Sequence, residues 1–298
     1  MRSASPDREP EGGLPAPFVF LAQVAARTSR IRLGTAIVTL PLELPIRVAE
    51  DASVLDIMSG GRLEVGVAPG GNLSAYTAFG LDSKDRHTLM VHHLDLLRDA
   101  WAGRSLPGGD SLYPVNPGLA DRIWQATFSI EGAQRAGRAG DGLMLSRNQP
   151  RAQGPGRLSL DEIQNPLIDA YLEALPQGRE PRILASRTVF VADDRKEALR
   201  HCETGIRGTG AKLAGVRRLP PGASVEEAVA LLDIHTGCPE EVIASLQADS
   251  ALARATDWTV QVHSIDPPHP HILRSIELMA QIVAPGLAWQ PVAAAGVL

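Results

Sequence analysis

The chain has 298 residues, of which 44% are hydrophobic and 21% are charged, and its formal net charge is −5. A nucleic-acid-binding surface is not expected, because binding of a polyanion draws on an excess of Lys and Arg that this composition lacks. No run of about 18 apolar residues is present, which excludes a membrane-spanning helix from the expected elements. The length allows one large domain or two modest ones.

The cysteine content and the first residues bear on the compartment in which the chain works. Cys202 and Cys238 are far apart and form neither a CxxC motif nor a disulfide framework, which indicates a reducing compartment. The N-terminus lacks the apolar segment of a secretory signal. These features predict a soluble cytoplasmic protein.

The first part of the chain alternates helices and strands after a polar start. Residues 1–17 are charged and rich in Pro and Gly, which is typical of a loop or a disordered arm. Apolar residues at helical spacing predict three helices, over residues 18–28, 48–58 and 84–101. Two β-branched runs predict strands over 31–38 and 62–68, and the Gly pair at 60–61 ends the helix between them.

The same rhythm continues to the end of the chain. The pattern predicts strands over residues 122–128, 142–146, 182–191 and 258–264. It predicts helices over residues 130–139, 161–175, 239–246 and 272–282, with a mostly helical stretch over 193–235 that is broken near 208–222. Six strands separated by helices imply parallel pairing through right-handed crossovers. The helices favour a (β/α) barrel, which needs eight strands, and an open doubly wound sheet remains the alternative.

Two segments at strand ends are candidates for a ligand site. GVAPGGN, residues 66–72, has neither the Lys of a phosphate-binding loop nor the spacing of GxGxxG, so a turn is favoured over a ligand site. Its glycines would nevertheless let a ligand approach the backbone. Ser129 follows a strand and precedes a helix, which predicts a helix N-cap, and the N–H groups at such an end suit a phosphate. Most N-cap serines bind only their own helix.

The histidines do not predict a metal site. His87, His92 and His93 share one helix without the i,i+4 spacing of metal ligands, so a solvated helix face is favoured. His263 ends the last strand and is either a catalytic residue or a buried core histidine. The HPH at 269–271 is expected in a surface loop. The absence of GxSxG gives no support for an α/β-hydrolase nucleophile.

Several long segments together resemble the bacterial luciferase-like flavin monooxygenase family. They are RTSRIRLGTAIVTLPLELPIRVAEDASVLDIMSGGRLEVGVAPGG (27–71), AFGLD (78–82), QRAGRAGDGLMLS (134–146), GCPEEVIASL (237–246) and PHPHILRSIELMAQIVAP (268–285). The resemblance extends over nearly the whole chain from about Gly12 onward. It implies a single (β/α)8 TIM-barrel domain of the luciferase-like type over residues 18–290.

The resemblance also implies an oxidoreductase activity and a cofactor. Family members commonly use reduced FMN, delivered by a separate flavin reductase, and O2 to insert an oxygen atom into a small organic substrate. Relatives that use the deazaflavin F420 instead transfer a hydride, and such a reductase is the alternative. The residues that correspond to cofactor-binding positions are Thr35, Ala36, Ile37, Gly70, Gly71, Asn72, Thr127, Ser129 and Gly132. The Cys-Arg pair of the luciferases proper is replaced by Ala68 and Pro69, which disfavours aldehyde luciferase chemistry.

The resemblance further implies a barrel that lacks its first two strands and first helix. In the family, the counterpart of residues 11–23 follows the second strand. The family often carries a His at the end of that strand, whereas the first histidine of this chain is His87, so this role is unfilled. A misassigned start, a decayed gene and a shortened, non-catalytic flavin-binding protein all remain open. Unpaired strand edges favour self-association, and family members commonly pair, so we expect a homodimer.

Overall fold

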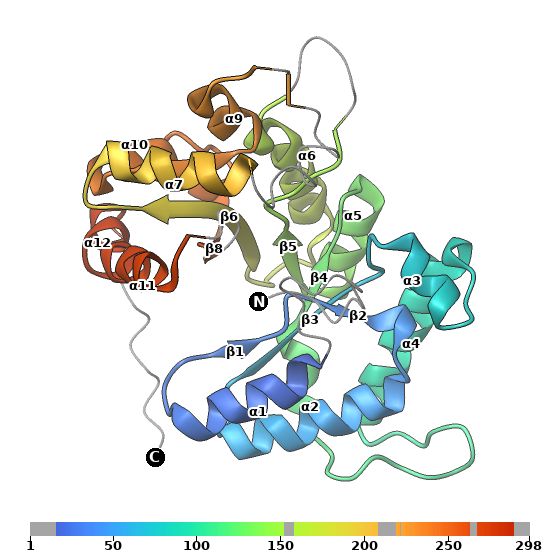
Figure 1. Ribbon diagram of the computed structural model, residues 1–298. Coiled ribbons are helices and arrows are strands. Elements are labelled where there is room, and N and C mark those ends of the chain that lie inside the picture. The colour runs from blue at the N-terminus through green and yellow to red at the C-terminus, as the bar shows by residue number, and fades with distance from the viewer. Residues whose placement is uncertain (1–15, 152–157, 208–218, 221, 263–266, 289–298) are drawn as a thin grey trace. The chain divides into compact units, whose positions relative to one another are not determined.

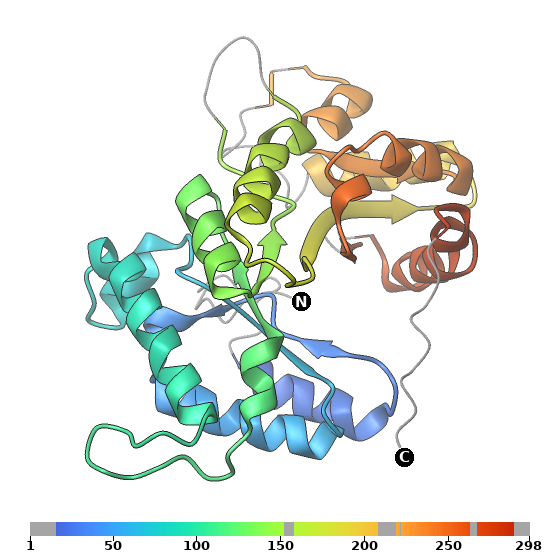
Figure 2. The ribbon, with the colours of Figure 1, turned by 180° about the vertical axis from the view of Figure 1, so that it is seen from behind.

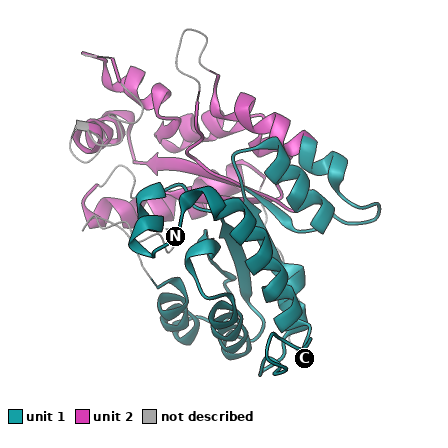
Figure 3. Ribbon diagram, turned by 90° about the vertical axis from the view of Figure 1, so that its right-hand side faces the viewer, with its two compact units in different colours: residues 1–144, 170–181 teal, residues 145–169, 182–298 magenta. Residues whose placement is uncertain are grey.

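The computed structural model describes residues 16–151, 158–207, 219–220, 222–262 and 267–288. The chain divides into two compact units, unit 1 (residues 1–144 and 170–181) and unit 2 (residues 145–169 and 182–298) (Figure 3). Each unit combines parallel strands with helices, as expected for an α/β fold. In the described ranges, no helix is both long enough and apolar enough to cross a membrane. That residues 18–290 form one domain stays a prediction.

Unit 1 is built on parallel strands that follow the order of the chain. The strands are β1 (Leu33–Gly34), β2 (Val38–Thr39), β3 (Leu63–Ala68), β4 (Ile123–Ala126) and β5 (Gly142–Leu145). Both β1 and β2 pair with β3, which pairs with β4, which in turn pairs with β5. The helices are α1 (Pro17–Arg27), α2 (Pro45–Ser59), α3 (Leu73–Ala78), α4 (Arg86–Trp101) and α5 (Ile130–Ala139).

The core of unit 1 lies between these strands and three helices. Helices α1, α2 and α4 lie side by side in both views (Figures 1 and 2). The apolar side chains of β3 at Leu63, Val65 and Val67 are fully buried against them. Trp101 ends α4 and donates its indole N–H to the Ala49 carbonyl on α2 at 3.1 Å. The apolar stripes predicted for these helices therefore meet in one core.

The turn between α2 and β3 is fixed by polar side chains of the family-like LDIMSGGRLE segment. Gly60 ends α2 in the left-handed conformation with φ 72°, as its position predicted. Arg62 donates hydrogen bonds to the carbonyls of Thr28 and Ile31, both at 2.9 Å. Arg62 thus holds the segment after α1 and the last residue of α2 at the start of β3, and this role is structural.

The predicted strand over 31–38 is wrong in one respect, because the structure divides it into β1 and β2. The hydroxyl of Thr35 donates to the Gly66 carbonyl at 2.8 Å and accepts from the Gly66 N–H at 2.9 Å. The Thr35 hydroxyl therefore makes the two hydrogen bonds to Gly66 that backbone groups would make in a continuous strand. The Ala36–Ile37 peptide bond that follows is cis.

Unit 2 is centred on the long strand β6 (Ile183–Val191). Strand β7 (Ile234–Gly237) pairs with residues 188–191 of β6, and β8 (Asp257–Gln261) pairs with residues 184–188, both in parallel. The helices are α7 (Arg195–Arg207), α9 (Val225–Leu231), α10 (Pro239–Gln247), α11 (His269–Leu278), a π-helical turn (Met279–Val283) and α12 (Ala284–Gly286). Helix α6 (Leu160–Ala174) contributes residues to both units.

The structure of unit 2 also differs from the sequence-based predictions, at β7 and at the start of α11. The stretch 193–235 holds α7 and α9 on either side of the predicted break, as expected, but its last residues begin β7, because pairing with β6 overrides local helix preference. The HPH at 269–271 begins helix α11 rather than lying in a loop, and Pro is well suited to a first helical turn. The described residues thus contain eight strands where six were predicted.

Candidate cofactor site in unit 1

Three strands of unit 1 end at the same edge of the sheet. Thr39 of β2 lies opposite Ala68 of β3, and Val67 of β3 lies opposite Gln125 of β4. The segments that follow β3 and β4, residues 69–72 and 127–129, therefore leave the sheet at one edge. Ligands of parallel α/β proteins bind at the carboxyl ends of the strands.

Thr127, Ser129 and Gly132 come together at the start of α5. The hydroxyl of Ser129 accepts a hydrogen bond from the Gly132 N–H at 3.1 Å, which confirms the predicted N-cap. Thr127 Oγ1 accepts one from the Ser129 N–H, also at 3.1 Å. A Cβ on Gly132 would lie 2.0 Å from Thr127 Oγ1, so glycine is needed for this close approach. Two hydroxyls and the positive end of a helix thus converge at the edge of the sheet.

The Gly70–Asn72 segment is held by residues on both sides. Gly70 has φ +78°, and a Cβ there would lie 2.5 Å from Cγ2 of Thr39. The Tyr76 hydroxyl donates to the Pro69 carbonyl, and burial raises the pKa of Tyr76 to about 12. Asn72 caps α3 by accepting from the Ser74 N–H at 3.2 Å. Nothing lies within 4 Å of a Cβ built on Gly71, so this backbone is open to a ligand.

The Thr35–Ile37 segment follows the end of β1, joins it to β2 and lies beside the middle of β3. Thr35 is 1% exposed, and its hydroxyl is engaged with Gly66. Ala36 is exposed and Ile37 is half-buried. Of the three residues expected to line the flavin ring, Ala36 and Ile37 are therefore the accessible ones.

Charged groups of α4 and α5 interact with His87 of α4, and the sequence-based reasoning missed them. Partial desolvation lowers the pKa of His87, and the guanidinium groups of Arg86 and Arg135 lower it further, whereas Glu131 opposes this shift. Arg135 donates its Nε–H to Gln125 Oε1 at 2.9 Å. The sequence did contain a signal for Arg86. It is the first residue of α4, and a cation is unfavourable at the positive end of a helix, so its presence there suggests another role.

The three histidines of α4 belong to no cluster of metal-ligating side chains in the part of the chain that the structure describes. His87 and His92 are exposed on α4, as expected for a solvated face. His93 is half-buried, and its Nδ1 lies 3.0 Å from the Leu40 carbonyl oxygen. His263 lies outside the described residues.

Comparison with known proteins places these features in a family. A family model described as luciferase-like monooxygenase matches residues 4–256. The 4-hydroxyprotoasukamycin monooxygenase of Streptomyces nodosus subsp. asukaensis is 29% identical over 92% of this chain and 78% of that protein. An F420-dependent glucose-6-phosphate dehydrogenase of Kribbella flavida is 28% identical over 47% of this chain and 46% of that protein.

Solved structures show the same fold. The monooxygenase RslO1 from Streptomyces bottropensis has a TM-score of 0.71 at 26% identity, over 91% of this chain and 83% of that one. The oxygenating constituent of 3,6-diketocamphane monooxygenase from Pseudomonas putida, solved with FMN, has a TM-score of 0.69 at 20% identity, over 92% and 84%. The fold and the sequence agree, and the chain belongs to the luciferase-like monooxygenase family.

Proposed function

We propose that this chain is an FMN-dependent monooxygenase that binds the flavin at the carboxyl edge of the unit 1 strands. The observation that carries the proposal is the convergence of Thr127, Ser129 and Gly132 at the start of α5. A phosphate there meets two hydroxyl groups and the positive end of a ten-residue helix. Arg135 on the same helix adds positive charge, which Glu131 in its first turn partly offsets.

The residues around this edge fit the remainder of a flavin. Gly70 and Gly71 present backbone without side chains, which suits the close approach of a planar ring. The expected neighbours of the flavin are a small side chain at Ala36, an apolar one at Ile37 and an amide at Asn72. When bound, reduced FMN supplies the activation of O2 for oxygen insertion into a small organic substrate. The chain's own task is then to hold the flavin, orient the substrate and exclude water.

Two further expectations belong to this proposal. A separate flavin reductase supplies the reduced cofactor, and two copies of the chain associate as a homodimer on a TIM-barrel scaffold. The alternative cofactor is F420, and the similarity to the F420-dependent dehydrogenase of Kribbella flavida supports this alternative. The same titration with F420 in place of FMN distinguishes them, since only the correct cofactor should bind in the micromolar range and raise the melting temperature.

The test compares FMN with riboflavin, which lacks the phosphate. We expect Ser129→Asp to weaken FMN binding by about tenfold while riboflavin binding stays unchanged, because Asp preserves the N-cap but repels the phosphate. Ser224→Asp is the matched control. Ser224 caps α9 in the same way, so the same substitution places a carboxylate at a helix N-cap outside the proposed site.

The two outcomes have different meanings. An unchanged ratio of FMN to riboflavin affinity in Ser129→Asp would show that the phosphate is not at α5. FMN binding without reductase-coupled oxygen consumption would favour the non-catalytic flavin-binding protein over the monooxygenase.

A further inference from the structure

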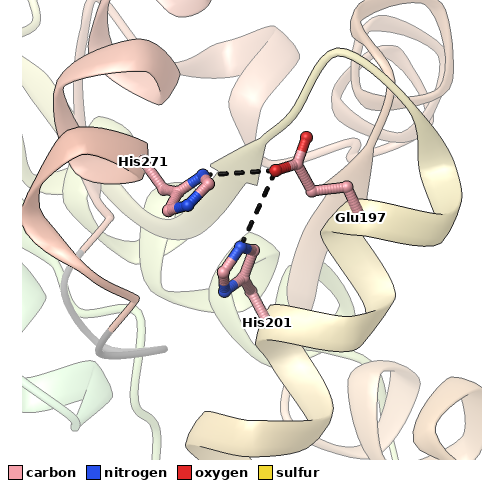
Figure 4. Close-up of side chains that lie close together, drawn as sticks. All are labelled: Glu197, His201 and His271. Atoms are coloured by element: carbon pink, nitrogen blue, oxygen red, sulfur yellow. Dashed lines mark ion pairs between the residues drawn. The ribbon is translucent and has the colours of Figure 1, made fainter.

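Unit 2 contains a cluster of three metal-ligating side chains. Glu197 and His201 project from α7, and His271 projects from the first turn of α11 (Figure 4). We propose that these three residues bind a divalent first-row transition-metal ion such as Zn2+. The cluster lies in unit 2, and the proposal is independent of the flavin site in unit 1.

The distances between the donor atoms fit a metal centre. His271 Nδ1 lies 3.2 Å from Glu197 Oε1, and His201 Nε2 lies 3.9 Å from the same oxygen. All three donor atoms lie within 4.8 Å of one another. Ligands about 2.0–2.1 Å from a tetrahedral Zn2+ are about 3.3 Å apart. One donor pair already has this spacing, and small side-chain rotations must close the other two from 3.9 Å and from no more than 4.8 Å.

The helix holds two of the ligands in register. Glu197 and His201 are four residues apart and therefore share one face of α7. The neighbouring row of Ala198 and Cys202 is fully buried in the core of unit 2, which fixes the rotation of the helix. The His201 ring packs edge-on against Phe190 with centroids 5.7 Å apart, so its orientation is also set.

His201 provides an independent indication of a ligand. The residue is 9% exposed, and its Nε2 is buried without a hydrogen-bond partner among the described residues. This is the atom that faces Glu197 in Figure 4. Buried polar atoms are nearly always paired, and an unpaired one needs an explanation. A metal ion bound to Nε2 would satisfy this atom.

The local charges suit the neutral imidazole that binds metals. Burial lowers the pKa of His201, as do His271 and Arg200, although Glu197 acts in the opposite direction. The Glu197 and His271 side chains are 26% and 36% exposed, which gives a metal a path of entry and room for a water ligand. Arg200 Nη2 lies 3.8 Å from Glu197 Oε1 and would compete with the metal for this carboxylate.

The experiment uses the full chain after treatment with a chelator and desalting. Calorimetric titration with Zn2+ should show one site per chain, and Zn2+ should raise the melting temperature. Titration with Co2+ should give the visible absorption bands of a tetrahedral complex. We expect His201→Ala and Glu197→Gln each to weaken Zn2+ binding by about tenfold or more. Arg200→Gln should strengthen it by removing the competing cation.

The control is His269→Ala, which removes an exposed histidine from the same helix turn as His271. This variant should bind Zn2+ as the wild-type chain does. His271→Ala provides a second test at a half-exposed position, where folding is least affected. The proposal is overturned if the wild-type chain does not bind Zn2+, or if the ligand variants bind it as tightly as His269→Ala does.

Discussion

Asp56 and Arg122 form a two-pronged ion pair in unit 1, with nitrogen–oxygen distances of 2.6 and 2.8 Å. Asp56 is 3% exposed and also accepts hydrogen bonds from the Leu63 N–H at 3.1 Å and from the Asn116 amide at 2.8 Å. One carboxylate therefore joins α2, the start of β3 and the segment before β4. This aspartate belongs to the motif that resembles the family, so part of that resemblance reports the fold rather than the chemistry.

The first prediction concerns acid stability. Burial favours the neutral acid, but hydrogen bonds from Arg122, Asn116 and Leu63 outweigh it and hold the pKa of Asp56 below its ordinary value of 3.8. The stabilisation is therefore present above that value and is lost as the pH falls through the lower, folded pKa. Asp56→Asn should cost about 3–5 kcal/mol at pH 7. Urea unfolding from pH 3 to 7 should show a weaker pH dependence in the variant, and equal slopes would contradict this account.

The second prediction concerns the buried ion pair of unit 2. Arg187 is 1% exposed and donates to both carboxylate oxygens of Asp249, at 2.6 and 3.0 Å. Asp249→Asn leaves a buried guanidinium unpaired and should cost about 3–5 kcal/mol. Arg104→Gln is the control because it breaks an exposed pair with Asp99, which is worth about 0–1 kcal/mol. Denaturant unfolding measures both, and equal losses would rule out a special role for the buried pair.

The third prediction concerns the packing of β3 against Thr35, the residue that follows β1. A Cβ on Gly66 would lie 2.2 Å from the Thr35 carbonyl oxygen and 2.8 Å from Met144 Cε. Gly66→Ala should therefore lower stability by about 1–3 kcal/mol or more, since overpacking forces the backbone apart. Gly71→Ala has open space around it and should change stability by no more than about 0.5 kcal/mol. Thermal melts of the two variants give the comparison, and matching melting temperatures would refute it.

The sequence was most informative where structure is decided by neighbours along the chain. The N-cap at Ser129 and the end of α2 at Gly60 depend on contacts within three or four residues, and both predictions are confirmed. The strand ends that carry the candidate cofactor site followed from the alternation of helices and strands. Whether the residues at these ends bind a flavin stays a prediction.

The features that the sequence did not predict depend on partners far along the chain. Strand β7 is a strand because residues of β6 lie beside it, and no local pattern reveals that pairing. The i,i+4 spacing of Glu197 and His201 was present in the sequence, but His271 joins them only through the packing of unit 2. The three side chains are brought together only by the folded chain.

The pairing of β6 has a consequence for the order in which the molecule folds. Strand β6 pairs with β8, which lies much later in the chain, whereas β1, β2 and β3 are close neighbours in sequence. Closing a long loop costs more entropy than closing a short one, and distant contacts form slowly. During synthesis, β1 and β2 can therefore dock on β3 early, while β6 must await the last strand. Until then residues 184–188 of β6 lack this partner, so the sheet of unit 2 is completed later than that of unit 1.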